Sequence, residues 1–169
     1  MITQATLADV PALNNLVNSA YRGDSSRKGW TTEADLLDGT RTDENYIKTI
    51  MEEPQSVVLK YVEQEKILGC VRLQNQGEKM YLGMFAVDPE AQGNGIGKKI
   101  LSASEAEAQK QNCRLIEMTV ISVRQDIIAW YNRHGYRTTG IVKPMKFDNP
   151  SAGIPKKELE FVVLEKLLL

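Results

Sequence analysis

The stretch Val87-Asp88-Pro89-Glu90-Ala91-Gln92-Gly93-Asn94-Gly95-Ile96-Gly97-Lys98-Lys99 holds three glycines at alternate positions. The apolar run before it, residues 81–87, predicts a buried strand, and the Ala-, Glu-, Lys- and Gln-rich segment after it predicts a helix. Glycines in such a turn let the backbone approach a ligand closely, and the first N–H groups of the helix point at that ligand. The stretch therefore predicts an anion site for a phosphate or a pyrophosphate.

Two other glycine motifs do not fit this stretch. A dinucleotide-binding fingerprint would need a glycine where Lys98 stands, and a Walker A loop would need a glycine at Gln92 and a hydroxyl at Lys99. The pattern Q/R-x-x-G-x-G/A does fit, through Gln92, Gly95 and Gly97. It resembles the acyl-CoA pyrophosphate loop of the GNAT (general N-acetyltransferase) superfamily. The alternative for these residues alone is a turn whose glycines serve packing.

A second motif lies further along the chain, after one more predicted helix and strand. The sequence Trp130-Tyr131-Asn132-Arg133-His134-Gly135-Tyr136 resembles the second GNAT signature, written roughly Y-x-x-x-G-F/Y. On its own it could also be a helix that ends in a glycine cap over packed aromatic rings. The two signatures in this order, with the elements around them, extend the resemblance over nearly the whole chain.

Composition and charge narrow the class of protein. The chain has 169 residues, 42% of them hydrophobic and 25% charged, which suits a single domain spanning residues 1–169. A net charge of -1 does not favour a nucleic-acid partner. Cys70, Cys113 and His134 lack the spacing of a metal site, so we expect no metal and two buried free thiols. No segment approaches the ~20 apolar residues of a membrane span, so we expect no membrane partner and a cytoplasmic protein.

Hydrophobic periodicity predicts one mixed α/β domain. The expected strands are 2–5, 56–62, 66–74, 80–87, 115–121, 136–142 and 159–164. The expected helices are about 9–21, 30–37, 43–51, 98–111 and 124–134, and residues 143–157 are expected to form a loop.

The resemblance implies a particular architecture and a cofactor site. The GNAT fold has a central, mostly antiparallel twisted sheet with helices on both faces, and the strand before the glycine loop splays away from the next strand. The pantetheine arm of acetyl-CoA would pair with backbone groups of Phe85, Ala86 and Val87. The pyrophosphate would bind the N–H groups of the loop, from Gln92, Gly93, Asn94 and Gly95 to Ile96, Gly97 and Lys98.

The implied reaction is direct transfer of an acetyl group from acetyl-CoA to a primary amine. Tyr131 matches the family position whose hydroxyl lies near the sulfur of CoA, and it is our candidate for the general acid. The position of a glutamate found in some members is Tyr81 here. Glu117, a carboxylate in an apolar run, is a candidate base or else an exposed residue on the alternating face. A solvent proton relay is the other option.

Two residues near the second motif remain ambiguous in the sequence. Arg124 stands where many members have an asparagine, and its guanidinium could contact CoA phosphates, contact the substrate or simply be solvated. We expect His134 to be structural.

The resemblance puts the acceptor near the early helices and a late loop. Trp30, Glu33 and Asp35 would favour a small or cationic amine, through carboxylates and a ring face, or else simply start a helix. Residues 144–147 could close the other side of the cleft. Three alternatives stay open, namely a non-catalytic acyl-CoA-binding module, an ATP-binding regulatory domain and an acetyltransferase acting on protein N-termini or lysines. Family members often dimerise, so a homodimer is also an open prediction.

Overall fold

The computed structural model describes residues 1–21, 37–38, 41–144, 154–155 and 159–168. Their elements, in chain order, are β1 (Ile2–Gln4), η1 (Leu7–Asp9), α1 (Val10–Tyr21), β2 (Leu37–Asp38), α3 (Glu44–Glu52), β3 (Ser56–Glu63), β4 (Lys66–Asn75), β5 (Lys79–Val87), α4 (Ile96–Lys110), β6 (Leu115–Ile121), α5 (Gln125–Arg133), β7 (Arg137–Pro144), β8 (Ile154–Pro155) and β9 (Glu160–Leu167). None of these helices has the length and apolar character of a membrane span.

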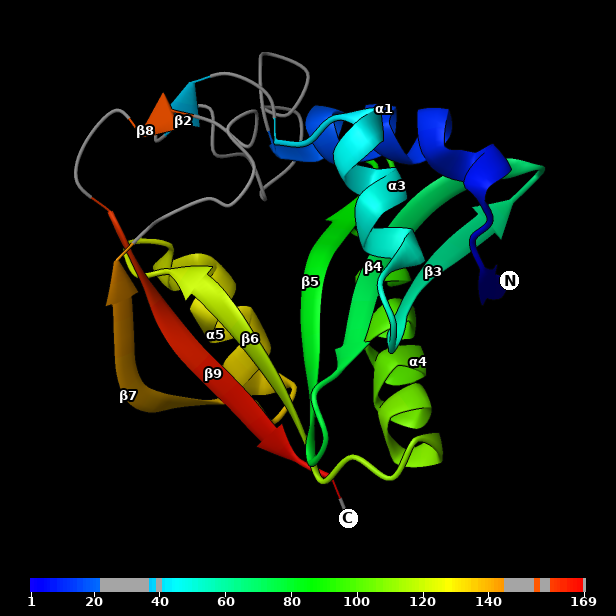
Figure 1. Cartoon of the computed structure of the whole chain (residues 1–169). Coiled ribbons are helices and arrows are strands. Elements are labelled where there is room, and N and C mark those ends of the chain that lie inside the picture. Colours follow the sequence, from blue (N-terminus) through cyan, green and yellow to red (C-terminus); the bar gives the residue numbers. More distant parts are fainter. Residues whose placement is uncertain (22–36, 39–40, 145–153, 156–158, 169) are drawn as a thin grey trace.

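Seven of the strands form one sheet in the order β1-β3-β4-β5-β6-β9-β7 (Figure 1). Every neighbouring pair in this sheet is antiparallel except β5 and β6, which run parallel. The strands β2 and β8 form a separate antiparallel pair. The expectation of a mostly antiparallel mixed α/β fold is therefore confirmed.

The parallel pair is short, and this opens the sheet. The strands β5 and β6 are paired only from Lys79 opposite Leu115 to Tyr81 opposite Glu117. Beyond that point the two strands diverge, as Figure 1 shows. The predicted splay after the first residues of the pair is thus present.

A β-bulge in β5 accompanies the divergence. The pairing with β4 shifts by one residue next to Met84, whose φ of 48° lies in the left-handed region. A bulge bends its strand and changes the face to which later side chains point. Met80 and Leu82 belong to one hydrophobic cluster, whereas Met84 and Ala86 belong to the other.

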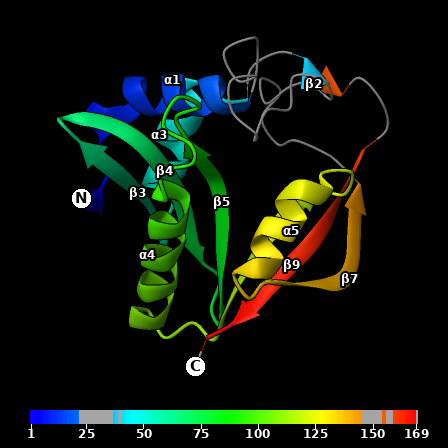
Figure 2. The same ribbon diagram turned by 180° about the vertical axis from the view of Figure 1, so that it is seen from behind.

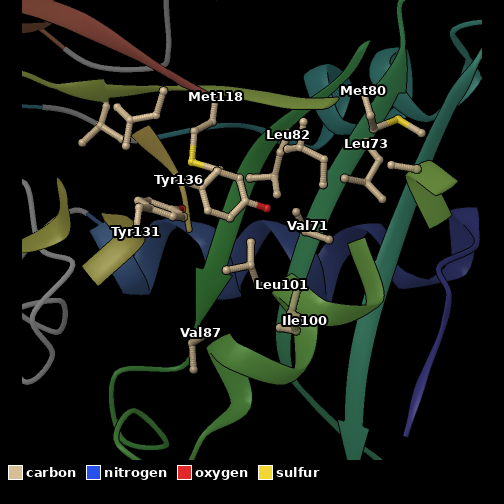
Figure 3. Close-up of a cluster of buried hydrophobic side chains, with 14 of the residues drawn as sticks. Val71, Leu73, Met80, Leu82, Val87, Ile100, Leu101, Met118, Tyr131 and Tyr136 are labelled. Carbon is tan, nitrogen blue, oxygen red and sulfur yellow. The ribbon is translucent and has the colours of Figure 1, made fainter. Parts of the chain in front are cut away.

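The two clusters lie on opposite faces of the sheet. One contains buried residues of α4 and α5, and the other contains those of α1 and α3 (Figure 2). In the first cluster, Met118 and Tyr136 lie close together, and Tyr131 lies at one end (Figure 3). This packing fixes α5, and with it Tyr131, against the second half of the sheet.

Some element boundaries differ from those expected. The helix α4 begins at Ile96 rather than at Lys98, because Gly95 (φ 77°) is its N-cap. Leu37 was expected in a helix and Ile154 and Pro155 in a loop, but Leu37 and Asp38 (β2) pair with Ile154 and Pro155 (β8). Pairing between segments far apart in sequence overrides local helix propensity here. The last strand, β9, continues to Leu167, and residues 30–36 of the expected helix lie outside the described residues.

The side chain of Asn18 in α1 binds the backbone of Arg41 and Thr42, just before α3. Its side-chain oxygen accepts hydrogen bonds from the backbone N–H groups of Arg41 (2.8 Å) and Thr42 (3.0 Å). Its amide nitrogen donates to the carbonyl oxygen of Thr42 (3.1 Å). Because Thr42 is buried, water cannot easily replace these bonds.

We expect Asn18→Ala to lower the free energy of unfolding by about 1–3 kcal/mol, because it leaves buried backbone groups without partners. Asn15→Ala, on the exposed side of the same helix, is the matched control and should change it by less than about 0.5 kcal/mol. Denaturant unfolding measures both. Equal losses in the two variants would contradict the role given to Asn18.

Candidate active site

A cavity of about 390 Å³ lies between the glycine loop, β5 and α5. Residues from five segments line it: Tyr21, Phe85, Val87, Gln92, Gly93, Gly95, Ile96, Gly97, Lys98, Ile127, Trp130, Tyr131 and His134. Most of the cofactor residues expected from the sequence are thus together at one cavity. Its shape is set by the divergence of β5 and β6 and by the two helices that follow these strands.

The glycine loop has the geometry of an anion site. Gly93 (φ 91°) and Gly95 (φ 77°) adopt left-handed conformations, and a Cβ on either would meet open space. The positive φ, and not a lack of space, therefore favours glycine at position 95. This left-handed residue is the N-cap of α4, which begins at Ile96. The first N–H groups of a helix have no carbonyl one turn before them, so they can donate to an anion.

Side chains brace this loop from within. Gln92 donates from its side-chain amide to the carbonyl oxygen of Val87 (3.1 Å), and Asn94 donates to the carbonyl oxygen of Ala91 (3.0 Å). Lys98, in the first turn of α4, adds a cationic side chain to the cavity wall. The two side-chain amides thus hold the conformation of the loop. An anion bound there would contact the loop N–H groups and the Lys98 ammonium.

The backbone of β5 presents alternate residues to the gap. The N–H of Asp88 donates to the carbonyl oxygen of Leu68 on β4 (2.8 Å), so the backbone groups of Asp88 and Ala86 face β4. Those of Phe85 and Val87 face the opposite edge, toward β6. Of the expected backbone set, Phe85 and Val87 therefore face the gap, whereas Ala86 faces β4.

Tyr131 brings a buried phenol to the cavity. Its side chain is 8% exposed, and its ring packs edge-on against Trp130 (5.1 Å), Tyr136 (5.7 Å) and Phe85 (6.4 Å) between centroids. Its hydroxyl makes no hydrogen bond to any residue that the structure describes. Burial, together with a smaller electrostatic contribution from Tyr21, raises the pKa of Tyr131 above its ordinary value. The phenol therefore keeps its proton at neutral pH and can donate it into the cavity.

Glu117 is not brought to this cavity. It lies opposite Tyr81, at the last paired position of β5 and β6, and its carboxylate forms an ion pair with the Lys79 ammonium (3.2 Å). The position of Glu117 therefore does not support the expected role of general base, because its carboxylate pairs with Lys79 at the closed end of the gap and does not line the cavity. Tyr81, at the family's glutamate position, contacts the hydroxyl of Thr119 (3.2 Å).

Arg124 and His134 have local partners. The Arg124 guanidinium pairs with Asp126 in the first turn of α5 (3.4 Å), and Arg124 does not line the cavity. Contact with CoA phosphates is therefore not supported by its position. His134 lines the cavity, but its ring lies over Trp130 (4.2 Å between centroids) and its Nδ1 is 2.7 Å from the Trp130 carbonyl oxygen. These contacts fit the structural role expected for it.

Tyr21 was missed by the sequence reasoning, which treated it as part of the apolar face of α1. Its hydroxyl donates a hydrogen bond to the carbonyl oxygen of Phe85, and its side chain lines the cavity. A weak signal was available, since a polar-tipped aromatic stands last on that face. The expected acceptor residues Trp30, Glu33 and Asp35, and residues 145–147, lie outside the described residues.

Comparisons with known proteins agree with this geometry. The profile of the Acetyltransferase (GNAT) family matches residues 11–136, more than half of the chain. No curated protein sequence matches. Among solved structures, the chain resembles the ribosomal-protein-S18-alanine N-acetyltransferase of Escherichia coli, with a TM-score of 0.75 and 14% identity over 99% of this chain and 93% of that one.

Two further structures have the same fold. The ribosomal-protein-alanine N-acetyltransferase of Brucella melitensis has a TM-score of 0.74 and 19% identity over 99% of both chains. The protein yncA of Salmonella typhimurium, solved with its cofactor acetyl-CoA, has a TM-score of 0.73 and 19% identity over 100% of this chain and 94% of that one. At these identities the likeness establishes the fold.

We expect Gly95→Glu to weaken acetyl-CoA binding about 100-fold or more, because a carboxylate beside the pyrophosphate costs several kcal/mol. Gly77→Glu is the matched control, since Gly77 also has a positive φ (98°) and open space around it but lies in the turn between β4 and β5. Both variants should lose about 1–2 kcal/mol of stability from the left-handed backbone. Titration calorimetry separates them, and retained affinity in Gly95→Glu would overturn the pyrophosphate assignment.

Proposed function

This chain belongs to the Acetyltransferase (GNAT) family, whose members transfer acetyl groups from acetyl-CoA, and on that premise we propose that its acceptor is a primary amine. Family membership supports an acyltransferase that uses acetyl-CoA. The proposal goes further by naming an amine as the acceptor and direct transfer as the route. We retain a single domain over residues 1–169 as part of the proposal.

One observation carries this proposal. The cavity joins an anion-binding loop to a buried phenol, Tyr131, whose hydroxyl has no hydrogen-bond partner in the described part of the chain. A buried hydroxyl without a partner costs free energy, so it is usually kept for a purpose. A proton donor near the sulfur of a bound thioester is such a purpose, because the departing thiolate needs a proton.

The residues of the chain divide the chemistry between them. Acetyl-CoA supplies the acyl group as a thioester. The N–H groups of Phe85 and Val87 face the gap, where they can stabilise negative charge on the carbonyl oxygen during attack. As the C–N bond forms and the C–S bond breaks, Tyr131 gives its proton to the sulfur. The proton lost by the amine returns to solvent, and Tyr131 is reprotonated from there.

The acceptor we favour is a small or cationic amine, because the sequence holds the acidic residues Glu33 and Asp35 in the segment expected near the acceptor. The alternative acceptor is a polypeptide N-terminus or lysine, because two proteins of the same fold are named as ribosomal-protein alanine acetyltransferases. A non-catalytic acyl-CoA-binding module is the remaining alternative.

The buried free thiols Cys70 and Cys113 support a reducing, cytoplasmic location.

The experiment that tests the proposal is CoA release from acetyl-CoA, followed as free thiol, with a panel of acceptors. The panel holds small polyamines, neutral primary amines, amino acids and short peptides with an alanine N-terminus. We expect turnover with at least one primary amine and a preference for cationic ones. Turnover with peptides alone would move the acceptor to proteins, and binding of acetyl-CoA without turnover on any amine would leave a binding module.

We expect Tyr131→Phe to lower kcat about 100-fold, the lower end of the usual range for a general acid, while the KM for acetyl-CoA changes little. The reason is that the hydroxyl acts mainly in the transition state. Tyr136→Phe is the matched control, because its hydroxyl bonds Glu105 (3.1 Å) and does not line the cavity. An unchanged kcat in Tyr131→Phe would remove Tyr131 as the acid.

A further inference from the structure

Two phenols from different helices face the same cavity. Tyr21 ends α1 on one side of the sheet, and Tyr131 lies in α5 on the other side. Both side chains line the cavity, and Tyr21 contributes, after burial, to the raised pKa of Tyr131. The reaction proposed above gives a role to Tyr131 alone.

The two hydroxyls differ in what they can offer. A hydroxyl carries one proton and two lone pairs. Tyr21 gives its proton to the carbonyl oxygen of Phe85, so toward the cavity its oxygen can act only as an acceptor. Tyr131 has no acceptor for its proton among the described residues and is a donor. One cavity therefore holds an acceptor phenol and a donor phenol.

Tyr21 is fixed at this place from two sides. Its hydroxyl is held by β5 at Phe85, one of the two residues whose backbone groups face the gap. Its ring lies under the Arg41 guanidinium, 5.9 Å from the ring centroid. Arg41 is in turn held through its backbone N–H by Asn18 (2.8 Å). The phenol oxygen of Tyr21 is thus kept beside the backbone that would face the thioester.

An attacking amine needs such an acceptor. Its nitrogen must direct its lone pair at the thioester carbon, so its N–H bonds have to point elsewhere and find partners. As the C–N bond forms, the nitrogen gains positive charge and its N–H groups become stronger donors. A neutral acceptor held in place is therefore worth more in the transition state than in the ground state.

We propose that Tyr21 accepts a hydrogen bond from the N–H of the incoming amine and thereby turns the nitrogen lone pair toward the thioester carbon. The inference rests on the proposed amine acetylation, and it adds the residue that orients the nucleophile. The bond that forms is C–N, the bond that breaks is C–S, and Tyr21 neither gains nor loses a proton overall.

Tyr21→Phe tests the inference, with Tyr136→Phe as the matched control and the best amine of the panel as acceptor. We expect kcat with that amine to fall about tenfold, the size of one hydrogen bond that strengthens in the transition state. The Kd of acetyl-CoA, measured by titration, should change less than about twofold, because the glycine loop that would bind the pyrophosphate is unchanged. The control should keep its kcat.

The outcomes separate the two proposals. An active wild type with an unchanged kcat in Tyr21→Phe would overturn the role of Tyr21 alone. A changed Kd for acetyl-CoA with an unchanged kcat would also overturn it, because Tyr21 would then act on the donor. A wild type that binds acetyl-CoA but turns over no amine would overturn both proposals.

Discussion

Beyond Tyr81, the edge of β5 that faces β6 is not paired with that strand, and the site is built along this open edge. Backbone N–H and C=O groups inside a protein need partners. Along this edge the carbonyl oxygens of Phe85 and Val87 are satisfied by the side chains of Tyr21 and Gln92. The strand β6 would have satisfied them in a continuous sheet. The divergence thus replaces a strand by two side chains and a cavity, into which an extended polar ligand can place its own amide groups.

The same divergence explains why residues from both faces of the sheet meet. The helix α1 packs on one face and α5 on the other (Figure 2), and in a closed sheet their side chains would be separated by the strands. Where the strands part, Tyr21 and Tyr131 line a single cavity. Side chains from the two faces of the sheet can then contact different substrates in one cavity. In the proposed reaction the glycine loop and α5 would face acetyl-CoA, and α1 with the chain at Arg41 would face the amine.

The sequence predicted the parts of the site that are encoded in short spacings. The three glycines with Gln92, and the aromatic motif around Tyr131, are local patterns, and the structure brings both to the cavity. Contacts between distant residues were not predictable. Tyr21 bonds a carbonyl 64 residues away, and Glu117 meets Lys79 only through the register of a parallel pair. The bulge at Met84 was hidden as well, because a non-glycine residue gives no sign of a positive φ.

The most direct test of the central claim compares ligands by thermal shift at matched concentrations of acetyl-CoA, CoA, ATP and NAD. A ligand at about 100 times its Kd adds about 2.7 kcal/mol, and at roughly 2–4 °C per kcal/mol for a chain of this size Tm rises by several degrees. The account predicts that acetyl-CoA and CoA raise Tm in this way and that ATP and NAD do not. A shift with ATP or NAD, or no shift with acetyl-CoA, would mean that the glycine loop is a packing turn or serves another ligand.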